Sequence, residues 1–146
     1  MGKFTSTKVI PLGSCAFRQP TAESHCKFLH GYRLQAKFWF TCDELDQNNW
    51  VVDFGGLKPL KAELEQTFDH KTVVSAADPH LQVFRMLELQ GIIELVILDT
   101  GVGIEKFAQH CFIAANAYVK EATKDRCWCS RVEVWEHEGN SAIYEI

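Results

Sequence analysis

Residues 32–41 alternate between apolar and polar side chains, and this pattern constrains the fold more than any other stretch of the sequence. A repeat of two residues is typical of a β-strand that buries one of its faces. The face expected to be buried carries Tyr32, Leu34, Ala36, Phe38 and Phe40. Residues 43–49 are polar and turn-forming, and residues 50–54 are again largely apolar. The sequence therefore predicts a β-hairpin over residues 32–54.

Helical spacing follows in three later segments. Residues 57–68 place apolar side chains on one side of a helix, with Pro59 tolerated in its first turn. Asp78-Pro79 and Gly91 predict the N-cap and the C-terminal stop of a short helix. Residues 104–123 predict a longer amphipathic helix. Its inward side is expected to carry Ile104, Phe107, Cys111, Ala115, Tyr118 and Ala122.

Three further strands are expected in the second half of the chain. Residues 92–98 are almost continuously apolar, residues 127–136 alternate, and residues 142–146 form a closing strand. The order is a strand pair, a helix, a small insertion, a helix and a strand pair. This order predicts a single α+β domain over residues 1–146, with helices packed on one face of an antiparallel sheet.

The composition is that of a globular domain and excludes several classes of function. The chain has 146 residues, 47% of them hydrophobic, and a net charge of −4. That charge offers no basic surface for nucleic acid. No segment reaches the about 18 apolar residues that a membrane-spanning helix needs, and no signal peptide is visible. We therefore expect a cytoplasmic protein with no nucleic-acid or membrane partner, whose cysteines are reduced.

A thiol and two histidines stand just before the alternating strand. Cys26 follows His25 directly and precedes His30 by four residues. A thiol and an imidazole held together by a turn can form a metal site, a nucleophile or an acid–base pair. The alternative is that Cys26 is a buried structural cysteine, the commoner fate of a single cysteine. Spacing alone leaves both interpretations open.

Four titratable residues later in the chain are candidates for the same chemistry. Asp69 and His70 fall where a helix is expected to end, so they form either a proton relay or a helix end with a favourable histidine. Glu136 shares a strand face with two valines. It therefore either meets donors, such as the N–H edge of a pterin-like ring, or reaches water at the strand end. Glu105 lies in the first turn of the long helix, where its charge is favourable.

Taken in order, these residues resemble the motifs of the 6-pyruvoyl-tetrahydropterin synthase and 6-carboxytetrahydropterin synthase family. The Cys-x-x-x-His-Gly-His motif of that family reads Cys-Lys-Phe-Leu-His-Gly-Tyr here, at residues 26–32. Further stretches resemble its DFxxLK passage, its LDHK motif, its TxENxA helix start and its closing strands, at residues 52–58, 68–71, 103–108 and 132–144. The resemblance covers most of the chain.

The resemblance implies a tunnelling fold, in which small subunits join four-stranded antiparallel sheets into a barrel. It also implies a homohexamer with active sites at subunit interfaces, and 7,8-dihydroneopterin triphosphate, a pterin triphosphate, as substrate. In the family, zinc grips the substrate side chain, a cysteine thiolate moves a proton and an Asp–His pair serves as the partner relay. By motif match, the catalytic roles fall to Cys26, Asp69 and His70. Glu136 would anchor the pterin ring, and Glu105 would take the supporting carboxylate position.

Three features depart from the family pattern. Tyr32 replaces the second histidine of the first motif, and a neutral phenol is a poor zinc ligand. The upstream zinc histidine is missing, and an ungapped alignment places Cys15 at about that position. We therefore expect an altered zinc site of His30 and Cys15, with His25 or another residue as the third ligand. Residues 72–101 are longer than the family usually has, and an inserted helix and strand there would reshape the substrate mouth.

The resemblance thus predicts a lyase that converts 7,8-dihydroneopterin triphosphate to 6-carboxy-5,6,7,8-tetrahydropterin, acetaldehyde and triphosphate, in queuosine-type 7-deazaguanine biosynthesis. The sister reaction, triphosphate elimination to the 6-pyruvoyl product, uses the same residues. One alternative is a non-catalytic pterin- or purine-binding protein of the same fold, which the altered metal set would suit. Another is activity on a different pterin, with the insertion as the specificity element. Retention of Cys26, Asp69 and His70 favours the enzyme.

Overall fold

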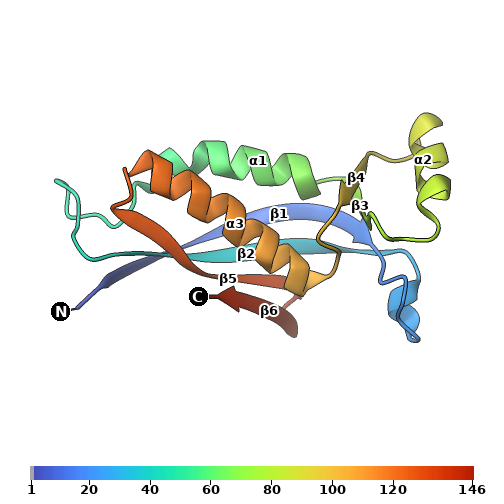
Figure 1. The fold of residues 1–146 in the computed structure, drawn as a ribbon, viewed down its shortest axis with the longest axis horizontal. Coiled ribbons are helices and arrows are strands. Elements are labelled where there is room, and N and C mark those ends of the chain that lie inside the picture. Colours follow the sequence, from blue (N-terminus) through green and yellow to red (C-terminus); the bar gives the residue numbers. More distant parts are fainter. Residues whose placement is uncertain (1) are drawn as a thin grey trace.

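A long antiparallel pair of strands, β1 (Phe4–Phe17) and β2 (His30–Cys42), forms the centre of the sheet (Figure 1). The structure is a computed structural model that describes residues 2–146. β5 (Cys127–His137) pairs with β2, and β6 (Asn140–Glu145) pairs with β5, both antiparallel. On the other side, β3 (Lys71–Ser75) runs parallel to β1, and β4 (Leu95–Leu98) runs parallel to β3. The strand order is therefore β4-β3-β1-β2-β5-β6.

Two helices cover one face of this sheet. α1 (Lys58–Phe68) and α3 (Ile104–Ala122) both lie over that face and contact each other (Figure 1). α2 (Leu81–Leu89) lies apart from them, beside β4 at one end of the sheet. Short 3₁₀ helices occupy His25–Lys27 and Phe54–Leu57. Within residues 2–146, no helix is long and apolar enough to cross a membrane.

The hydrophobic core lies between the sheet and the helices α1 and α3. The buried face of β2 is the one that the alternation predicts, and Tyr32 at its start is partly buried. The fully buried residues that meet in the core include Leu34, Ala36, Phe38, Phe40, Leu60, Leu64, Phe68, Phe107, Cys111, Ala115 and Val119. Burying each large apolar side chain contributes roughly 1.5–3 kcal/mol. The predicted strand over residues 32–41 and both long helices are therefore confirmed, with the apolar side of each turned inward.

The partner of β2 differs from the prediction. Residues 50–54 form no strand; they bend into a 3₁₀ helix, where the Asp53 carboxylate accepts the Gly55 N–H at 3.0 Å. β2 pairs instead with β1, whose register shifts at a bulge between Pro11 and Gly13. Because a bulge moves the alternation onto the other set of residues, β1 does not show the pattern of a continuous strand.

The sheet has six strands rather than the four that the resemblance implies. Its antiparallel part, β1-β2-β5-β6, does have four strands, and β3 and β4 extend it in parallel. The segment over residues 72–101 supplies most of this extension and also α2, so the predicted inserted helix and strand are both present.

Two predicted details of the helices are wrong. α2 begins at Leu81 with His80 as its N-cap, so Asp78 is not the cap of this helix. In α3, Ala122 is exposed, and Val119 takes the inward position instead. Gly91, with φ of 75°, follows the end of α2 as predicted.

Candidate active site

Cys26 lies on the connection between β1 and β2, residues 18–29. It is the central residue of the 3₁₀ turn His25–Lys27, and Ser24 caps this turn by accepting the Cys26 N–H at 3.3 Å. The Cys26 thiol is exposed, whereas the other five cysteines are buried. Cys26 is therefore not a structural core cysteine, and its thiol is open to a substrate.

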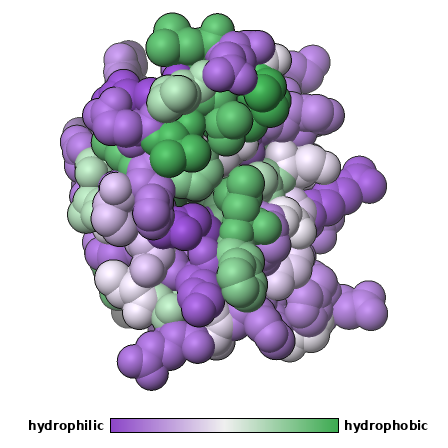
Figure 2. Space-filling view, turned by 90° about the vertical axis from the view of Figure 1, so that its right-hand side faces the viewer, coloured by the Kyte–Doolittle hydropathy of each residue, from purple (hydrophilic) through white to green (hydrophobic). Residues whose placement is uncertain are grey.

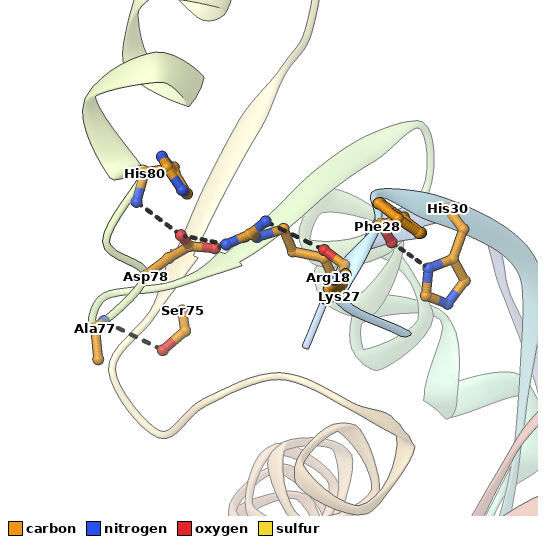
Figure 3. A network of polar contacts seen from close by, with 8 residues as sticks. All are labelled: Arg18, Lys27, Phe28, His30, Ser75, Ala77, Asp78 and His80. Carbon is orange, nitrogen blue, oxygen red and sulfur yellow. Dashed lines mark hydrogen bonds and ion pairs between the residues drawn. The ribbon is translucent and has the colours of Figure 1, made fainter. Parts of the chain in front are cut away.

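His30, the first residue of β2, is oriented by a carbonyl of the same connection. Its Nδ1–H donates to the Phe28 carbonyl at 2.6 Å (Figure 3). A carbonyl oxygen only accepts, so the proton of the neutral ring lies on Nδ1 and Nε2 keeps its lone pair. The ring packs against Phe17 and edge-to-face against Tyr32, each with centroids 5.3 Å apart. His30 can therefore accept a proton or a ligand at Nε2.

Tyr32 lies between the other candidate groups. Its ring is 6.0 Å, centroid to centroid, from both Phe17 and His137. Burial raises the pKa of the Tyr32 phenol, and the charges of Glu136 and of an ionised Cys26 raise it further. The charges of the thiolate and of the carboxylate thus act on one phenol, although the two groups come from different elements. Because the pKa is raised, the phenol is a hydrogen-bond donor at neutral pH.

Glu136 continues the side of β5 that Val132 and Val134 bury, at an irregularity in the pairing with β6. Its side chain is partly buried, and Oε1 accepts from Asn140 Nδ2 at 3.0 Å. With Tyr32 it lines a cavity of about 750 Å³. A carboxylate can accept several more hydrogen bonds. This position can therefore receive the paired N–H donors of a pterin-like ring.

Asp69 and His70 form the predicted pair. His70 has a left-handed φ of 61°, and its Nδ1–H donates to Asp69 Oδ1 at 2.9 Å. The His70 N–H donates to the Ser14 carbonyl at 2.7 Å, and the Ser14 N–H donates to Asp69 Oδ1 at 3.2 Å. The pair is thus docked on the bulge of β1. This hydrogen bond between the two side chains is the one that a relay requires, and the relay itself stays a prediction.

Gly13 permits this docking, and the sequence reasoning missed it. Its φ is 96°, and a Cβ atom at this position would lie 2.0 Å from Asp69 Oδ1. Glycine tolerates both the backbone conformation and the close approach. The available signal was an isolated glycine within a segment of strand-like residues, which suggests a bulge.

His70 borders a second cavity of about 710 Å³, lined also by Lys71 and by residues 91–94 of the inserted segment. Gly31, Tyr32 and Arg33 line both this cavity and the Glu136 cavity, so the two cavities are neighbours along the start of β2. Arg33, His70 and Lys71 gather basic groups in a chain whose net charge is −4, although Lys71 forms an ion pair with Glu94, which lines the same cavity. Local positive charge of this kind suits a phosphorylated ligand. Arg33 carries no motif signal, and Lys71 closes the LDHK-like stretch at residues 68–71 but received no role from the sequence.

Glu105 lies in the exposed first turn of α3, as predicted, and lines neither cavity. The N-terminal part of the Cys26 connection contacts the start of α3: Gln19 Nε2 donates to the Val102 carbonyl at 3.0 Å. Gly103 makes room for that contact, because a Cβ there would lie 2.1 Å from Gln19 Nε2. Glu105 is thus placed near the N-terminal part of the Cys26 connection rather than beside Glu136.

The predicted zinc ligands do not form a three-ligand site. Within residues 2–146, no three histidine, cysteine, aspartate or glutamate side chains are arranged to hold a metal ion. Cys15 lies opposite Tyr32 on the β1–β2 ladder, and Phe17 lies opposite His30. Burial raises the pKa of the Cys15 thiol to about 12, whereas zinc binds the thiolate. His25 is exposed in the turn beside Cys26, and His30 keeps a free Nε2.

The end of the molecule that carries the Cys26 connection and α2 is partly apolar, with hydrophobic side chains gathered on its surface (Figure 2). The large exposed apolar residues of these two segments are Phe28, Leu29, Val83, Met86, Leu89 and Ile92. Apolar surface of this extent, on the segment that carries the Cys26 thiol, is available for contact with a ligand or another chain.

Comparison with known sequences decides the family. A sequence model described as 6-pyruvoyl tetrahydropterin synthase matches residues 14–146. The chain belongs to the 6-pyruvoyl tetrahydropterin synthase family. Among curated proteins, the 6-carboxy-5,6,7,8-tetrahydropterin synthase of Rickettsia bellii is 30% identical over 60 residues. That match covers 40% of this chain and 44% of the Rickettsia protein, so the chain aligns with less than half of this relative.

Several solved structures share the fold. An uncharacterized protein of Wolinella succinogenes has a TM-score of 0.85 at 15% identity, over 99% of both chains. The 6-pyruvoyl tetrahydropterin synthase of Plasmodium falciparum has a TM-score of 0.68 at 13% identity, over 97% of this chain and 98% of that one. The Caenorhabditis elegans enzyme has a TM-score of 0.67 at 18% identity, over 100% and 97%. Because the sequence identities are low, these structures bear on the fold alone, and they support the predicted tunnelling fold. The parallel strands β3 and β4 extend the predicted four-stranded sheet.

Proposed function

We propose that this protein is a pterin-processing lyase that converts 7,8-dihydroneopterin triphosphate to 6-carboxy-5,6,7,8-tetrahydropterin, acetaldehyde and triphosphate. The observation that carries the proposal is the exposed thiol of Cys26 together with Glu136 and Tyr32, which line one cavity, and the charges of the thiolate and the carboxylate both act on the Tyr32 phenol. Family membership and the name of the Rickettsia bellii relative support the substrate class and the reaction. The proposal places the protein in cytoplasmic 7-deazaguanine (queuosine) biosynthesis.

Each residue has a role that its surroundings allow. Glu136 accepts the N–H edge of the pterin ring with the oxygen that Asn140 leaves free. Arg33 in the second cavity contacts the triphosphate, and Lys71 lies in the same cavity in its ion pair with Glu94. Cys26 removes a proton from the hydroxylated side chain of the substrate, and the Asp69–His70 pair transfers the partner proton. Asp69 holds the His70 ring through Nδ1, so Nε2 is the atom that exchanges the proton.

The zinc that the resemblance implies enters no step of this proposal. His30 keeps a free Nε2, but its neighbours on the buried side, Phe17 and Tyr32, are not zinc ligands of the usual kind. His30 Nε2 and the Tyr32 phenol can instead hydrogen-bond the hydroxyl groups of the substrate side chain.

We further propose that the active protein is a homo-oligomer, a hexamer by analogy with the family, with active sites at subunit interfaces. Glu136 and His70 border different cavities of one chain. The sheet also ends in two strands with a free edge, β4 and β6. Pairing of such edges between chains and burial of the exposed apolar residues would both stabilise an assembly.

The second candidate function is pterin binding without catalysis. The substitution of Tyr32 for the motif histidine and the unassembled metal ligands favour it, because both remove groups that a zinc-dependent lyase uses. The triphosphate elimination that gives the 6-pyruvoyl product is a variant of the first proposal, since it needs the same side chains.

Incubation of the purified protein with 7,8-dihydroneopterin triphosphate, followed by mass analysis of the products, tests the proposal. A carboxypterin together with acetaldehyde supports the first reaction, and a 6-pyruvoyl product supports the sister reaction. Binding with no conversion would instead support the second candidate. Cys26→Ala should abolish turnover while leaving pterin binding largely intact, because the thiol moves a proton and does not anchor the ring.

A further inference from the structure

The connection that carries Cys26 is held by polar contacts rather than by packing. Across residues 21–29 no side chain is buried, and only Ala22 is partly covered. A segment without buried apolar side chains opens at low cost unless hydrogen bonds restrain it. The position of the Cys26 thiol therefore depends on where the backbone of this segment is bonded.

Three successive carbonyl groups around Cys26 are bonded. The Cys26 carbonyl accepts the Gln19 N–H at 2.8 Å, and the Lys27 carbonyl accepts Arg18 Nη1–H at 3.1 Å. The Phe28 carbonyl accepts His30 Nδ1–H at 2.6 Å. The middle bond is the only one of the three that comes from a long side chain, so its strength depends on how firmly Arg18 is held.

Arg18 is held by a carboxylate from the inserted segment, and Figure 3 shows the contacts from Asp78 through Arg18 to Lys27 and, on the next residue, the separate contact between Phe28 and His30. Arg18 Nε donates to Asp78 Oδ2 at 2.8 Å, and Nη2 donates to Asp78 Oδ1 at 3.2 Å. The side chains of Arg18 and Asp78 are only 17% and 1% exposed. A paired, two-bond contact of this kind fixes the plane of the guanidinium and thus the direction of its third donor.

Asp78 is itself fixed within its turn. Its Oδ1 also accepts the His80 N–H at 2.8 Å, and its own N–H donates to the Ser75 carbonyl at 3.0 Å. Ser75 Oγ accepts the Ala77 N–H at 3.2 Å. Asp78 is therefore an anchor on the end of β3, and not a freely moving surface charge.

We propose that Asp78 and Arg18 are positioning residues: the inserted segment holds the Cys26 connection in its working geometry through this buried ion pair and the Arg18–Lys27 bond. The inference rests on the proposed role of Cys26 in proton transfer. It gives residues 72–101 a function beyond lining the substrate cavity. Neither Arg18 nor Asp78 needs to touch the substrate for this role.

The test compares Arg18→Lys with the wild type by amide hydrogen exchange. A lysine ammonium keeps the charge opposite Asp78, but it lacks the planar fork that bonds Asp78 and the Lys27 carbonyl together. Amide exchange in peptides covering residues 24–30 should become about 10-fold faster or more, the effect of losing one bond from a charged donor. Exchange in β5 and β6 should not change.

Arg131→Lys is the matched control. Arg131 also forms an ion pair, with Nε 2.7 Å from Glu145 Oε2, but it lies on β5. The Arg131→Lys substitution should leave both amide exchange at residues 24–30 and turnover unchanged. Arg18→Lys should lower kcat at least about 10-fold and change KM little, because misplacing a reacting group lowers the chemical step.

Unchanged exchange at residues 24–30 in Arg18→Lys would overturn the proposal, and so would faster exchange with unchanged kcat. Asp78→Asn should reproduce the Arg18→Lys result. If that variant fails to fold, because the buried guanidinium has lost its counter-charge, the Arg18→Lys comparison still decides. Exchange requires no substrate, so a wild-type protein without lyase activity would refute the proposed function while the anchoring of the connection remains measurable.

Discussion

Replacing Gly13 by alanine is the substitution for which the structure gives the clearest magnitude. The new methyl group would lie 2.0 Å from Asp69 Oδ1 and 2.4 Å from Asp69 Cγ, so the carboxylate must move. Alanine at a φ of 96° costs about 1–3 kcal/mol in backbone strain. Displacing Asp69 loses its bond from the Ser14 N–H, which contributes about 1.5–3 kcal/mol, toward the lower end because Asp69 is partly exposed. We expect Gly13→Ala to lower the free energy of unfolding by about 3–5 kcal/mol.

The matched control is Gly101→Ala. Gly101 has a similar φ of 104°, but a methyl group there meets only the flexible Lys106 side chain, at 3.6 Å. It should therefore cost only the backbone strain, about 1–3 kcal/mol. Urea unfolding of the wild type and both variants measures the difference. Equal destabilisation by the two substitutions would refute the close packing of Asp69 on Gly13. Because Gly13→Ala displaces the Asp69–His70 pair, this variant should also have a lower turnover.

Three further predictions follow from the site. Glu136→Gln should weaken pterin binding about 10- to 100-fold in equilibrium titrations, because the anchor loses its charge. Glu133, whose carboxylate accepts from Ser141, provides the control, and Glu133→Gln should leave pterin binding unchanged. Equal weakening by the two substitutions would contradict the anchor role of Glu136. Burial raises the pKa of Asp78, but the hydrogen bonds from Arg18 and the His80 N–H and the positive charge of Arg18 outweigh it, so the pKa is lowered overall. The contribution of Asp78 to stability is therefore present above the unfolded-state pKa of about 3.9 and is lost as the pH falls below it. Urea unfolding between pH 6 and about pH 3 should show this acid loss in the wild type and a shallower slope in Asp78→Asn. Metal analysis of protein purified from zinc-supplemented medium should find well below one zinc per chain, whereas one zinc per chain that disappears in His30→Ala would contradict the ligand geometry described above.

The parts of the fold that the sequence predicts are those with an uninterrupted repeat. β2, α1, α3 and β5 each bury one continuous face, so local periodicity was enough to find them. β1 was missed because the bulge at Gly13 shifts its alternation, and its first half is polar. Residues 50–54 are apolar because Val51 and Val52 enter the core from a bend, which composition cannot distinguish from a strand.

In the candidate site, too, some residues could be identified from the sequence and others could not. Cys26, Asp69, His70 and Glu136 stand in motifs and could be named from the sequence. Asp78 could not be understood locally, because its partner Arg18 is 60 residues away in the chain. The Asp-Pro pattern suggested a helix cap, whereas tertiary structure uses the carboxylate in a buried ion pair. Cys15 was placed by counting along the chain, but the strand pairing sets Phe17, and not Cys15, opposite His30.

The most direct test of the central claim is product analysis with the wild type and Cys26→Ala side by side. Each protein is incubated with 7,8-dihydroneopterin triphosphate, and pterin products and acetaldehyde are quantified by mass. We predict a carboxypterin and acetaldehyde in equal amounts from the wild type, and neither from Cys26→Ala, although both proteins bind the pterin. Turnover that persists in Cys26→Ala, or a wild type that binds the substrate and leaves it unchanged, would contradict the account.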